Sequence, residues 1–472
     1  MIAKRLAVLC AVLALGAWAC GSVDNADESS PEGASGAGAH SGNPGAGGSG
    51  KKGDAAASGG AQGDFCSGGG PVVDVGDSNK PHLLCTGQVA ANTFLTALRT
   101  CNDTRLAGYL HTRAFDSGNG PYKEGVDDGG GAVGINHSYF VSAGYSDVGG
   151  SFAIAGDDSL SMAGFVQARG DLKLAGSATV PGYTKVARDA WFGGTFTDLG
   201  PVTIEGDLHH EKAVNAIPLS VGGTRTQEPV SFDRPCNCDP ASMLDVPAIV
   251  AQGKASNDNA SIGLDPARLS NVVGSEELTL SCGRYYLQKI GGVGSIVVNV
   301  TARAVLFVDG DLVATGNLQF KLSPGAQIDV FIRDNLLITG NASFGDKDHP
   351  AGTRLYVGGT GDVVLTGAGA FVGNVYAPRS KVTAVGFANV YGSVFANDFV
   401  VPGYARFVYD RSITDAGEDC DLPGPGPGTC DKCGSCPLPQ ACVDGACGPC
   451  EQDSDCCGLQ VCKDGKCLIL VK

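Results

Sequence analysis

The residues best suited to chemistry are the 19 cysteines, eleven of which lie near the C-terminal end. The spacings Cys430-x2-Cys433-x2-Cys436 and Cys447-x2-Cys450 are those of zinc ribbons, in which thiolates bind the metal tetrahedrally. A unit of about 50 residues, however, has too small a core to fold without covalent staples, and the export signal described below favours disulfides over metal. We therefore predict disulfides at Cys420, Cys430, Cys433, Cys436, Cys442, Cys447, Cys450, Cys456, Cys457, Cys462 and Cys467.

Six further cysteines are spread over the preceding sequence, and we expect them in disulfides too: Cys66, Cys85, Cys101, Cys236, Cys238 and Cys282. Disulfides of Cys66, Cys85 and Cys101 could crosslink the segment around them. Cys282 is a candidate partner for one of Cys236 and Cys238. The latter two form a Cys-x-Cys pair with no His nearby, which disfavours a metal site. No metal and no cofactor is predicted.

Candidate catalytic carboxylates occur in two pairs, Asp309 with Asp311 and Asp346 with Asp348. Polysaccharide-cleaving enzymes use such carboxylates, but Asp is also the ordinary turn residue. The sequence contains no GxSxG, HExxH, phosphate-binding loop or dinucleotide-binding glycine motif in a strand-to-helix setting. We predict no catalytic residues and no enzymatic activity.

Two other motifs have simpler structural readings. His209 and His210 directly follow a predicted strand, where exposed turn residues are commoner than a metal pair. Arg169-Gly170-Asp171 resembles a cell-binding motif, but Gly-Asp-Leu recurs at Gly206 and Gly310 as a turn entering a strand. Both motifs are therefore expected to be structural.

Residues 1–19 form a predicted export signal. Lys4 and Arg5 precede an apolar run that is too short to span a bilayer, and Ala17-Trp18-Ala19 stands directly before Cys20. This end resembles the bacterial lipoproteins, whose signal ends at a Cys that receives lipid and becomes the new N-terminus. Cys20 is the matching residue, although Ala17 stands where these signals usually carry Leu.

The alternative to lipidation is simple secretion, since Ala-Trp-Ala is also an ordinary cleavage site. Loss of Cys10 with the signal and acylation of Cys20 leave 17 cysteines, and an odd number implies a free or intermolecular thiol. Residues 20–65 argue for the lipid, because a Gly-, Ala- and Ser-rich disordered tether is most useful when one end is fixed. We expect membrane attachment through Cys20 and a cell-envelope location, at the outer membrane or cell surface.

A short phrase recurs through the later sequence, as in FVDGDLVATGN from Phe307 and FIRDNLLITGN from Phe331. Its final glycine recurs at Gly316, Gly340, Gly367, Gly386 and Gly403. Repeats of roughly 20 residues predict a solenoid, here an all-β, parallel β-helix-like one with short capping helices. Alternation predicts an interior column of Leu312, Ala314, Leu336, Ile338, Val363 and Leu365. Asn317 and Asn341 both follow the repeat glycine. Their side chains could stack as a ladder, or, as we favour, the residues could simply tolerate left-handed backbone angles.

The predicted organisation has six parts. They are the signal peptide (1–19), the disordered tether (20–65), a mixed capping segment with a helix over 88–100 (66–120), a first solenoid block with an irregular insertion (121–290), a second block (291–412) and a Cys-rich disulfide module (413–472). The formal charge of −16 argues against nucleic acid as a partner.

A family resemblance covers residues 278–410. It rests on Gly283-x-Tyr285-Tyr286, on Asp309-Gly310-Asp311 and on Tyr376-Ala377-Pro378. This stretch resembles the uncharacterised β-solenoid domains of exported bacterial proteins, which occur in choice-of-anchor and pilus-associated surface proteins. The resemblance implies a fold and a surface location but no activity.

Three functions follow as hypotheses. The first is a lipid-anchored envelope protein with a structural or adhesive solenoid, whose partners are envelope or extracellular polymers or other surface proteins. The second is a carbohydrate-binding or carbohydrate-cleaving β-helix, which the scarcity of Trp disfavours. The third is an ice-binding solenoid; Thr315, Thr339 and Thr366 recur once per turn, but no Thr-x-Thr array accompanies them.

Overall fold

The computed structural model describes residues 70–75, 83–127, 129–157, 160–162, 164–365, 370–385, 388–417, 441–443, 446–452, 455, 461–463 and 465–468. The predicted signal, Cys20, the tether, Cys66 and the cysteines at 420, 430, 433, 436, 456 and 457 lie outside the described residues.

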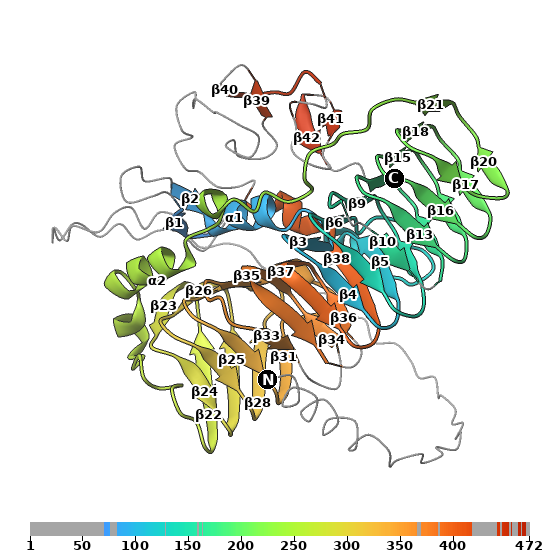
Figure 1. Cartoon of the computed structure of the whole chain (residues 1–472). Coiled ribbons are helices and arrows are strands. Elements are labelled where there is room, and N and C mark those ends of the chain that lie inside the picture. The colour runs from blue at the N-terminus through green and yellow to red at the C-terminus, as the bar shows by residue number, and fades with distance from the viewer. Residues whose placement is uncertain are drawn as a thin grey trace, which may run out of the picture. The chain divides into compact units, whose positions relative to one another are not determined.

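The described chain winds into a parallel β-solenoid of about 13 turns, which confirms the predicted fold class (Figure 1). Each turn contributes strands to three faces, here called A, B and C. Strands of successive turns pair in parallel, so every turn uses its neighbours to satisfy its backbone and to bury its interior side chains.

Face A consists, in spatial order, of β23 (Gly283–Leu287), β26 (Arg303–Val308), β29 (Gln327–Ile332), β32 (Thr353–Val357), β35 (Asn374–Ala384), β37 (Val394–Val401), β3 (Leu98–Thr100), β6 (Val133–Ile135), β9 (Phe152–Ile154), β12 (Leu172–Leu174), β15 (Ala190–Phe192), β18 (Leu208–His210) and β21 (Arg225–Gln227). Face B consists of β24 (Ile290–Gly292), β27 (Leu312–Ala314), β30 (Leu336–Ile338), β33 (Val363–Leu365), the second halves of β35 and β37, β4 (Thr104–Leu106), β7 (Tyr139–Val141), β10 (Leu160–Met162), β13 (Ala178–Val180), β16 (Phe196–Asp198) and β19 (Val214–Asn215).

Face C is formed by two ladders. One contains β22 (Ser275–Leu280), β25 (Ser295–Val300), β28 (Asn317–Leu322) and β31 (Asn341–Phe344); the other contains β34 (Ala370–Val372), β36 (Ala388–Tyr391), β38 (Ala405–Asp410), β5 (Leu110–Phe115), β8 (Ser146–Val148), β11 (Val166–Ala168), β14 (Thr184–Val186), β17 (Val202–Ile204) and β20 (Leu219–Val221).

The order of turns in the stack differs from their order in the chain. The chain enters the stack in its middle, where Leu98 pairs with Val394 on one side and with Val133 on the other. It winds outward to residue 227 (the first arm), runs back over residues 228–274 (the return segment), and winds inward from the opposite end over residues 275–410 (the second arm). We call the pairing of β37 with β3 and β4, and of β38 with β5, the seam.

The seam corrects the predicted organisation. Residues 66–120 do not cap an end of the solenoid, because β3, β4 and β5 form one of its central turns. The predicted helix over 88–100 is shorter and starts earlier, as α1 (Thr86–Thr93), and Leu98–Thr100 is a strand. The boundary predicted at residue 290 falls inside the first turn of the second arm.

Outside the solenoid turns lie a few short elements. They are the antiparallel pair β1 (Val72–Asp74) and β2 (Leu83–Cys85), the helix α2 (Val246–Ala255), and the 3-10 helices η1 (Ser117–Asn119), η2 (Pro240–Ser242), η3 (Asn259–Ile262), η4 (Pro350–Gly352) and η5 (Arg411–Asp415). The α2 helix begins where the Asp245 carboxylate accepts a hydrogen bond from Ala248 N (3.1 Å), with Pro247 in the first turn. Among the described residues no helix is long and apolar enough to cross a membrane.

The repeat glycine of the sequence lies at one corner of every described turn that carries it. A Cβ on Gly340 would lie 1.8 Å from the carbonyl oxygen of Gly316, and one on Gly316 would lie 2.0 Å from that of Gly294. The same stacking links Gly403, Gly108, Gly144, Gly164, Gly182 and Gly200 across the seam and through the first arm. Glycine recurs because the preceding turn occupies the space of a side chain.

Two details of the repeat can now be compared with expectation. In the predicted interior column, Leu312, Ala314, Leu336, Ile338 and Val363 are buried, whereas Leu365 is half-buried. Asn317 and Asn341 begin strands and pair in register, so the favoured prediction of left-handed backbone at these residues is wrong. The alternative prediction, a stacked ladder of Asn side chains, is closer to the structure. The Asn317 amide donates a hydrogen bond to Ser295 Oγ of the preceding turn (3.0 Å).

The described part of the Cys-rich segment contains two antiparallel hairpins. These pair β39 (Ala441–Val443) with β40 (Ala446–Gly448) and β41 (Val461–Lys463) with β42 (Lys466–Leu468). A disulfide joins Cys450 to Cys462.

Candidate functional site at the seam

Three 3-10 helices converge on one buried carboxylate where the two arms meet. Asp410, at the end of β38, is fully buried and accepts hydrogen bonds from Ser117 N (3.0 Å), Ala351 N (3.1 Å) and Ser412 Oγ (2.9 Å). These partners belong to η1, η4 and η5 respectively. A single side chain thus holds together three segments that come from the early, later and final parts of the solenoid sequence.

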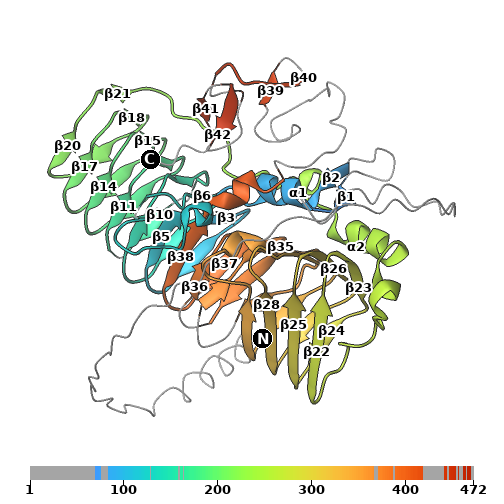
Figure 2. The same cartoon turned by 180° about the vertical axis from the view of Figure 1, so that it is seen from behind.

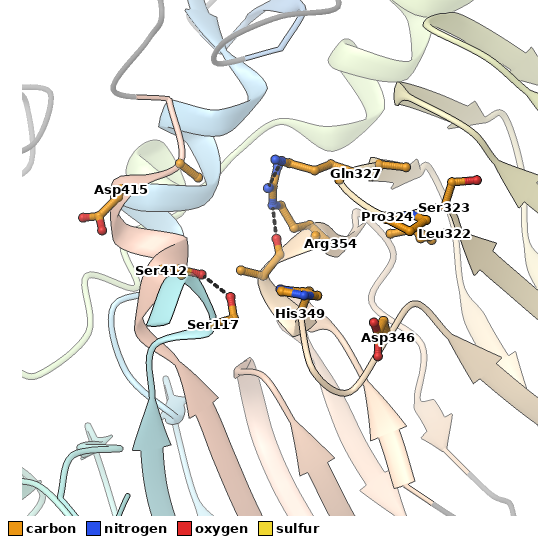
Figure 3. A pocket seen from close by; sticks show the side chains of 16 residues that line it. Ser117, Leu322, Ser323, Pro324, Gln327, Asp346, His349, Arg354, Ser412 and Asp415 are labelled. Carbon is orange, nitrogen blue, oxygen red and sulfur yellow. Dashed lines mark hydrogen bonds between the residues drawn. The ribbon is translucent and has the colours of Figure 1, made fainter. Parts of the chain in front are cut away.

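Beside this junction lies a cavity of about 660 Å³ (Figure 3). Its lining is mixed, with Ser117 and Ser412 hydrogen-bonded to each other (2.9 Å), the carboxylates of Asp346 and Asp415, and the imidazole of His349. Asp346, His349 and Asp415 are exposed, so the polar groups stand at the mouth rather than in an apolar interior. The acidic and imidazole groups of the cavity are therefore open to solvent, whereas Arg354 and Ser117 in its wall are buried.

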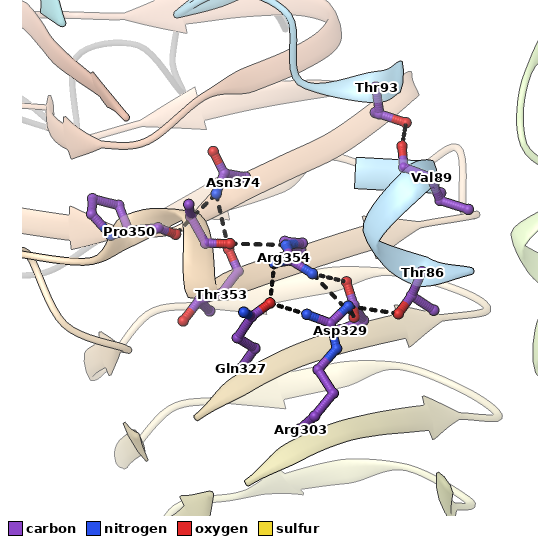
Figure 4. Close-up of polar contacts among 11 residues, drawn as sticks. Thr86, Val89, Thr93, Arg303, Gln327, Asp329, Pro350, Thr353, Arg354 and Asn374 are labelled. Carbon is purple, nitrogen blue, oxygen red and sulfur yellow. Dashed lines mark hydrogen bonds and ion pairs between the residues drawn. The ribbon is translucent and has the colours of Figure 1, made fainter. Parts of the chain in front are cut away.

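The wall of the cavity is built on a buried charge network (Figure 4). Asp329 on β29 is fully buried between Arg303 on β26 (2.9 Å) and Arg354 on β32 (3.2 Å). Thr86 Oγ1 of α1 accepts a hydrogen bond from Arg303 (2.7 Å), and Gln327 Oε1 accepts one from Arg354 (2.6 Å). Successive turns supply all three charged residues, and α1 covers them.

The network contains two guanidinium groups and one carboxylate. Burial lowers the pKa of Arg303 to about 10, and the Asp329 carboxylate partly offsets that effect. Further donors of the two guanidinium groups bond to Thr86, to Gln327 and, from Arg354 Nε, to Ala351 O (2.8 Å). Each group is thus held in place, which indicates a structural network rather than a reactive one.

A column of aromatic side chains runs along the outside of face A in the second arm. Phe331 and Tyr356 stack at 4.5 Å, and the column is continued by Tyr286, Phe307, Tyr376 and Phe395. Phe94, just after α1, packs on Tyr356 (5.6 Å), and a Cβ on Gly253 of α2 would touch the Phe307 ring. The helices α1 and α2 therefore cover this face, as Figure 2 shows for α2 beside β23 and β26.

The candidate carboxylates are not brought together into a catalytic pair. Asp309 accepts hydrogen bonds from Tyr286 (2.7 Å) and Lys254 (2.9 Å) and pairs with Arg333. Burial alone would raise the pKa of Asp309, but these partners lower it. Asp311 accepts from the Asn335 amide (2.9 Å), and Asp346 accepts from the backbone of Asp348 (3.0 Å), as expected of turn residues.

A second aromatic stack, missed in the sequence, follows the glycine corner through the seam. Tyr404, Tyr109, Tyr145, Phe165 and Tyr183 stack with centroids 4.5–4.9 Å apart and planes within 6°. Each ring directly follows a corner glycine, so the recurring Gly-aromatic dipeptide was the available signal. Both faces of the three inner rings, Tyr109, Tyr145 and Phe165, are covered by their neighbours, so only the edges of these rings remain for a ligand such as a sugar.

The two histidines and the Arg-Gly-Asp motif lie on the first arm. His209 stacks on Trp191 (5.3 Å) and contacts Glu228 (2.6 Å), whereas His210 is buried. Arg169 faces Asp147 (3.5 Å), and burial raises the pKa of Asp171 despite Arg188 and Lys173 nearby. Among the residues that the structure describes, no group of three His, Cys, Asp or Glu side chains is placed to hold a metal ion.

The cysteine pairing differs from expectation: Cys101 pairs outside its own segment, and Cys282, the candidate partner of Cys236 or Cys238, pairs with neither. Cys238 pairs with Cys101, which ties the return segment to the first arm, and Cys85 and Cys282 are also in disulfides. Cys236, expected in a disulfide, is a buried free thiol whose pKa burial raises to about 11. Asn136 holds this segment by bonding the backbone of Cys236 through both amide atoms (2.8 and 2.9 Å).

Residues 233–416 match a family model described as a domain of unknown function (DUF7305). The matched range begins in the return segment and ends just after η5, so it includes the second arm and leaves the first arm outside. No curated protein and no solved structure matches the chain. The second arm is thus similar to an uncharacterised domain, and the structure gives the matched region a β-solenoid fold.

Proposed function

We propose that the protein is an exported lipoprotein of the cell envelope, held at the outer membrane or cell surface by lipid on Cys20. Its solenoid is a structural or adhesive scaffold without enzymatic activity, and its Cys-rich module is a disulfide-stabilised contact unit. The partners are envelope or extracellular polymers or other surface proteins. The resemblance to choice-of-anchor and pilus-associated surface proteins supports the same location.

The observation that carries this proposal is the position of the seam. The chain enters the stack after α1 and leaves it at η5, and these two elements touch: Tyr409 donates a hydrogen bond to Phe94 O (2.7 Å). An anchor preceding α1 and a module following η5 therefore attach to the middle of the stack. Neither end of the stack is then a point of attachment, which suits a displayed scaffold.

The free thiol at Cys236 supports the lipid. Loss of Cys10 with the signal and acylation of Cys20 leave 17 cysteines, and one free Cys236 reduces them to an even number that can pair completely. The odd count that weighed against lipidation thereby favours it. Simple secretion with Cys20 unmodified would leave a second unpaired thiol.

Metabolic labelling with a fatty acid tests the anchor directly. The wild-type protein and a matched Cys10→Ala variant should take up label, Cys20→Ala should not, and globomycin should cause the precursor to accumulate. Equal processing of all three proteins without label would refute the anchor.

A thiol count tests the cysteine argument separately. Alkylation of the unreduced, denatured mature protein should modify one cysteine per chain, at Cys236, and modification of the folded protein should be slow because that thiol is buried. Retained zinc together with several alkylatable cysteines would contradict the disulfide assignment of the C-terminal module.

A further inference from the structure

The two ends of the solenoid differ in whether the last turn is covered. At the end of the second arm, residues 258–274 fold over the terminal turn and insert Leu264, Leu269 and Val272 into the core. The backbone of this cover bonds the exposed edges of β23 and β24, as in Gln288 N to Pro266 O (2.8 Å) and Gly291 N to Leu269 O (2.8 Å). The apolar interior at this end is thus sealed by the protein's own chain, although β22 on face C pairs only with β25.

The end of the first arm has no such cover among the described residues. The terminal strands β19, β20 and β21 pair only with the preceding turn, through β16, β17 and β18. Interior positions that are buried one turn earlier are here only half-buried, at Val214, Leu219 and Val221. Ile217, at the adjoining corner, is 89% exposed. Unpaired strand edges over an apolar core are a template for pairing with another chain.

We propose that this open end is the contact between two copies of the chain, related by a two-fold axis. A head-to-tail contact could continue only the β22 ladder of face C, because residues 258–274 already occupy the edges of β23 and β24 at the other end. The open end therefore finds an edge for all three of its faces only on another open end, and pairing of two such ends closes the assembly at two. The facing terminal strands of the two copies then run antiparallel and extend the ladders across the axis.

The charges of the terminal turn suit such a self-complementary contact. Its exposed side chains include two acids, Glu211 and Glu228, and two bases, Lys212 and Arg225. This balance contrasts with the formal charge of −16 for the whole chain, which would repel a second copy at most other surfaces. A two-fold axis brings the acids of one copy within reach of the bases of the other.

Sedimentation of the full mature protein, in density-matched detergent when it carries lipid, tests this proposal without depending on the anchor. The wild-type protein should sediment with twice the chain mass at micromolar concentration. Ile217→Arg places a charge at the contact and should weaken dimerisation at least about tenfold. Val273→Arg is the matched control, because Val273 is 80% exposed at the sealed end, and it should stay dimeric.

Three outcomes would overturn the proposal: a monomeric wild-type protein, assemblies larger than two chains, or equal loss of dimer in Val273→Arg. The alternative occupant is the Cys-rich module of the same chain. A monomeric wild-type protein whose module becomes protease-sensitive in Ile217→Arg would identify that occupant and refute the dimer.

Discussion

The two arms use one architecture in different ways. An outer turn of the first arm takes 18 residues from Leu172 to Ala190, with a three-residue strand on face A, whereas an outer turn of the second arm takes 24 residues from Phe307 to Phe331, with a six-residue strand on that face. The second arm is covered on face A by two helices and sealed at its end, and the first arm lacks both features among the described residues. The family match covers the second arm alone.

This difference shows what covering a solenoid requires. Strands such as β26 are buried along both faces, because their outward aromatic side chains pack under α1 and α2. The outer face A strands of the first arm, such as β12, bury alternate residues and leave the residue between them half-buried, whereas β6 and β9 nearer the seam are buried throughout. The second arm resembles a conventional globular core, whereas the first arm depends on stacking between neighbouring turns.

The largest expected loss of stability follows removal of the buried Asp329 carboxylate in the second arm. Asp329→Asn leaves Arg303 and Arg354 without a counter-charge, and breaking a buried ion pair costs about 3 to 5 kcal/mol. Urea denaturation should show that loss in the free energy of unfolding. Replacing all three residues together, as Arg303→Met, Asp329→Leu and Arg354→Met, should recover much of it. A loss below about 1 kcal/mol for the single change would show that the network does not stabilise this arm.

The next effect concerns the disulfide that ties the return segment to the first arm. Removing it with Cys101→Ala and Cys238→Ala should cost about 2 to 5 kcal/mol. Hydrogen exchange should then rise in residues near Cys238 before it rises in the second arm. Cys236→Ala is the control, because it keeps the disulfide and removes only a buried thiol. Equal exchange in both variants would show that the crosslink is dispensable.

A smaller loss of stability is expected in both arms when a corner glycine is replaced. Gly164→Ala in the first arm and Gly340→Ala in the second place a Cβ 1.7 and 1.8 Å from a carbonyl oxygen of the preceding turn. The resulting backbone shift should cost about 1 to 3 kcal/mol at each site, measured by thermal denaturation. Gly274→Ala is a matched corner control, since nothing lies within 4 Å of its Cβ. Tolerance of either substitution would show that the corner is less rigid in that arm.

The smallest expected effect is the pH-dependent contribution of one aspartate in each arm to stability, and its sign differs between the arms. Tyr286, Lys254 and Arg333 lower the pKa of Asp309 against the effect of burial, so its carboxylate stabilises the fold above the usual Asp pKa of about 3.9 and loses that contribution as the pH falls through the lowered value. Asp309→Asn should therefore lower the Tm at pH 7, with a smaller difference at pH 3.

Burial raises the pKa of Asp171 in the first arm, so its stabilising contribution is present below the usual pKa and is lost as the pH rises through the raised value. Asp171→Asn should then leave the Tm at pH 7 unchanged or higher. A lower Tm for both variants would remove this contrast between the arms.

The sequence predicted the local architecture well because its determinants are local. Gly316 and Gly340 recur where the preceding turn leaves no room for a side chain, and the column from Leu312 to Ile338 follows strand alternation. The covered outer face was also visible in principle, since Val305 to Val308 is apolar at every position.

The order of turns was not predictable in this way. Leu98 pairs with Val394 through ordinary backbone hydrogen bonds, and no local pattern marks which distant turn a strand edge will meet. The partner of Cys101 and the free state of Cys236 depend on the path of the return segment, which residue spacing does not specify. The candidate site at the seam was missed for the same reason.

The seam has a consequence for the way this protein is made. The turn containing β3, β4 and β5 is synthesised first among the solenoid turns. One of its strand edges stays unpaired until β37 and β38 are synthesised, almost 300 residues later. Until then the growing chain exposes a strand edge that pairs with its own last turn in the finished structure, and the stack becomes continuous in a single late step. Folding should consequently be slow and sensitive to truncation just before residue 394, and chaperones should be needed to protect that edge.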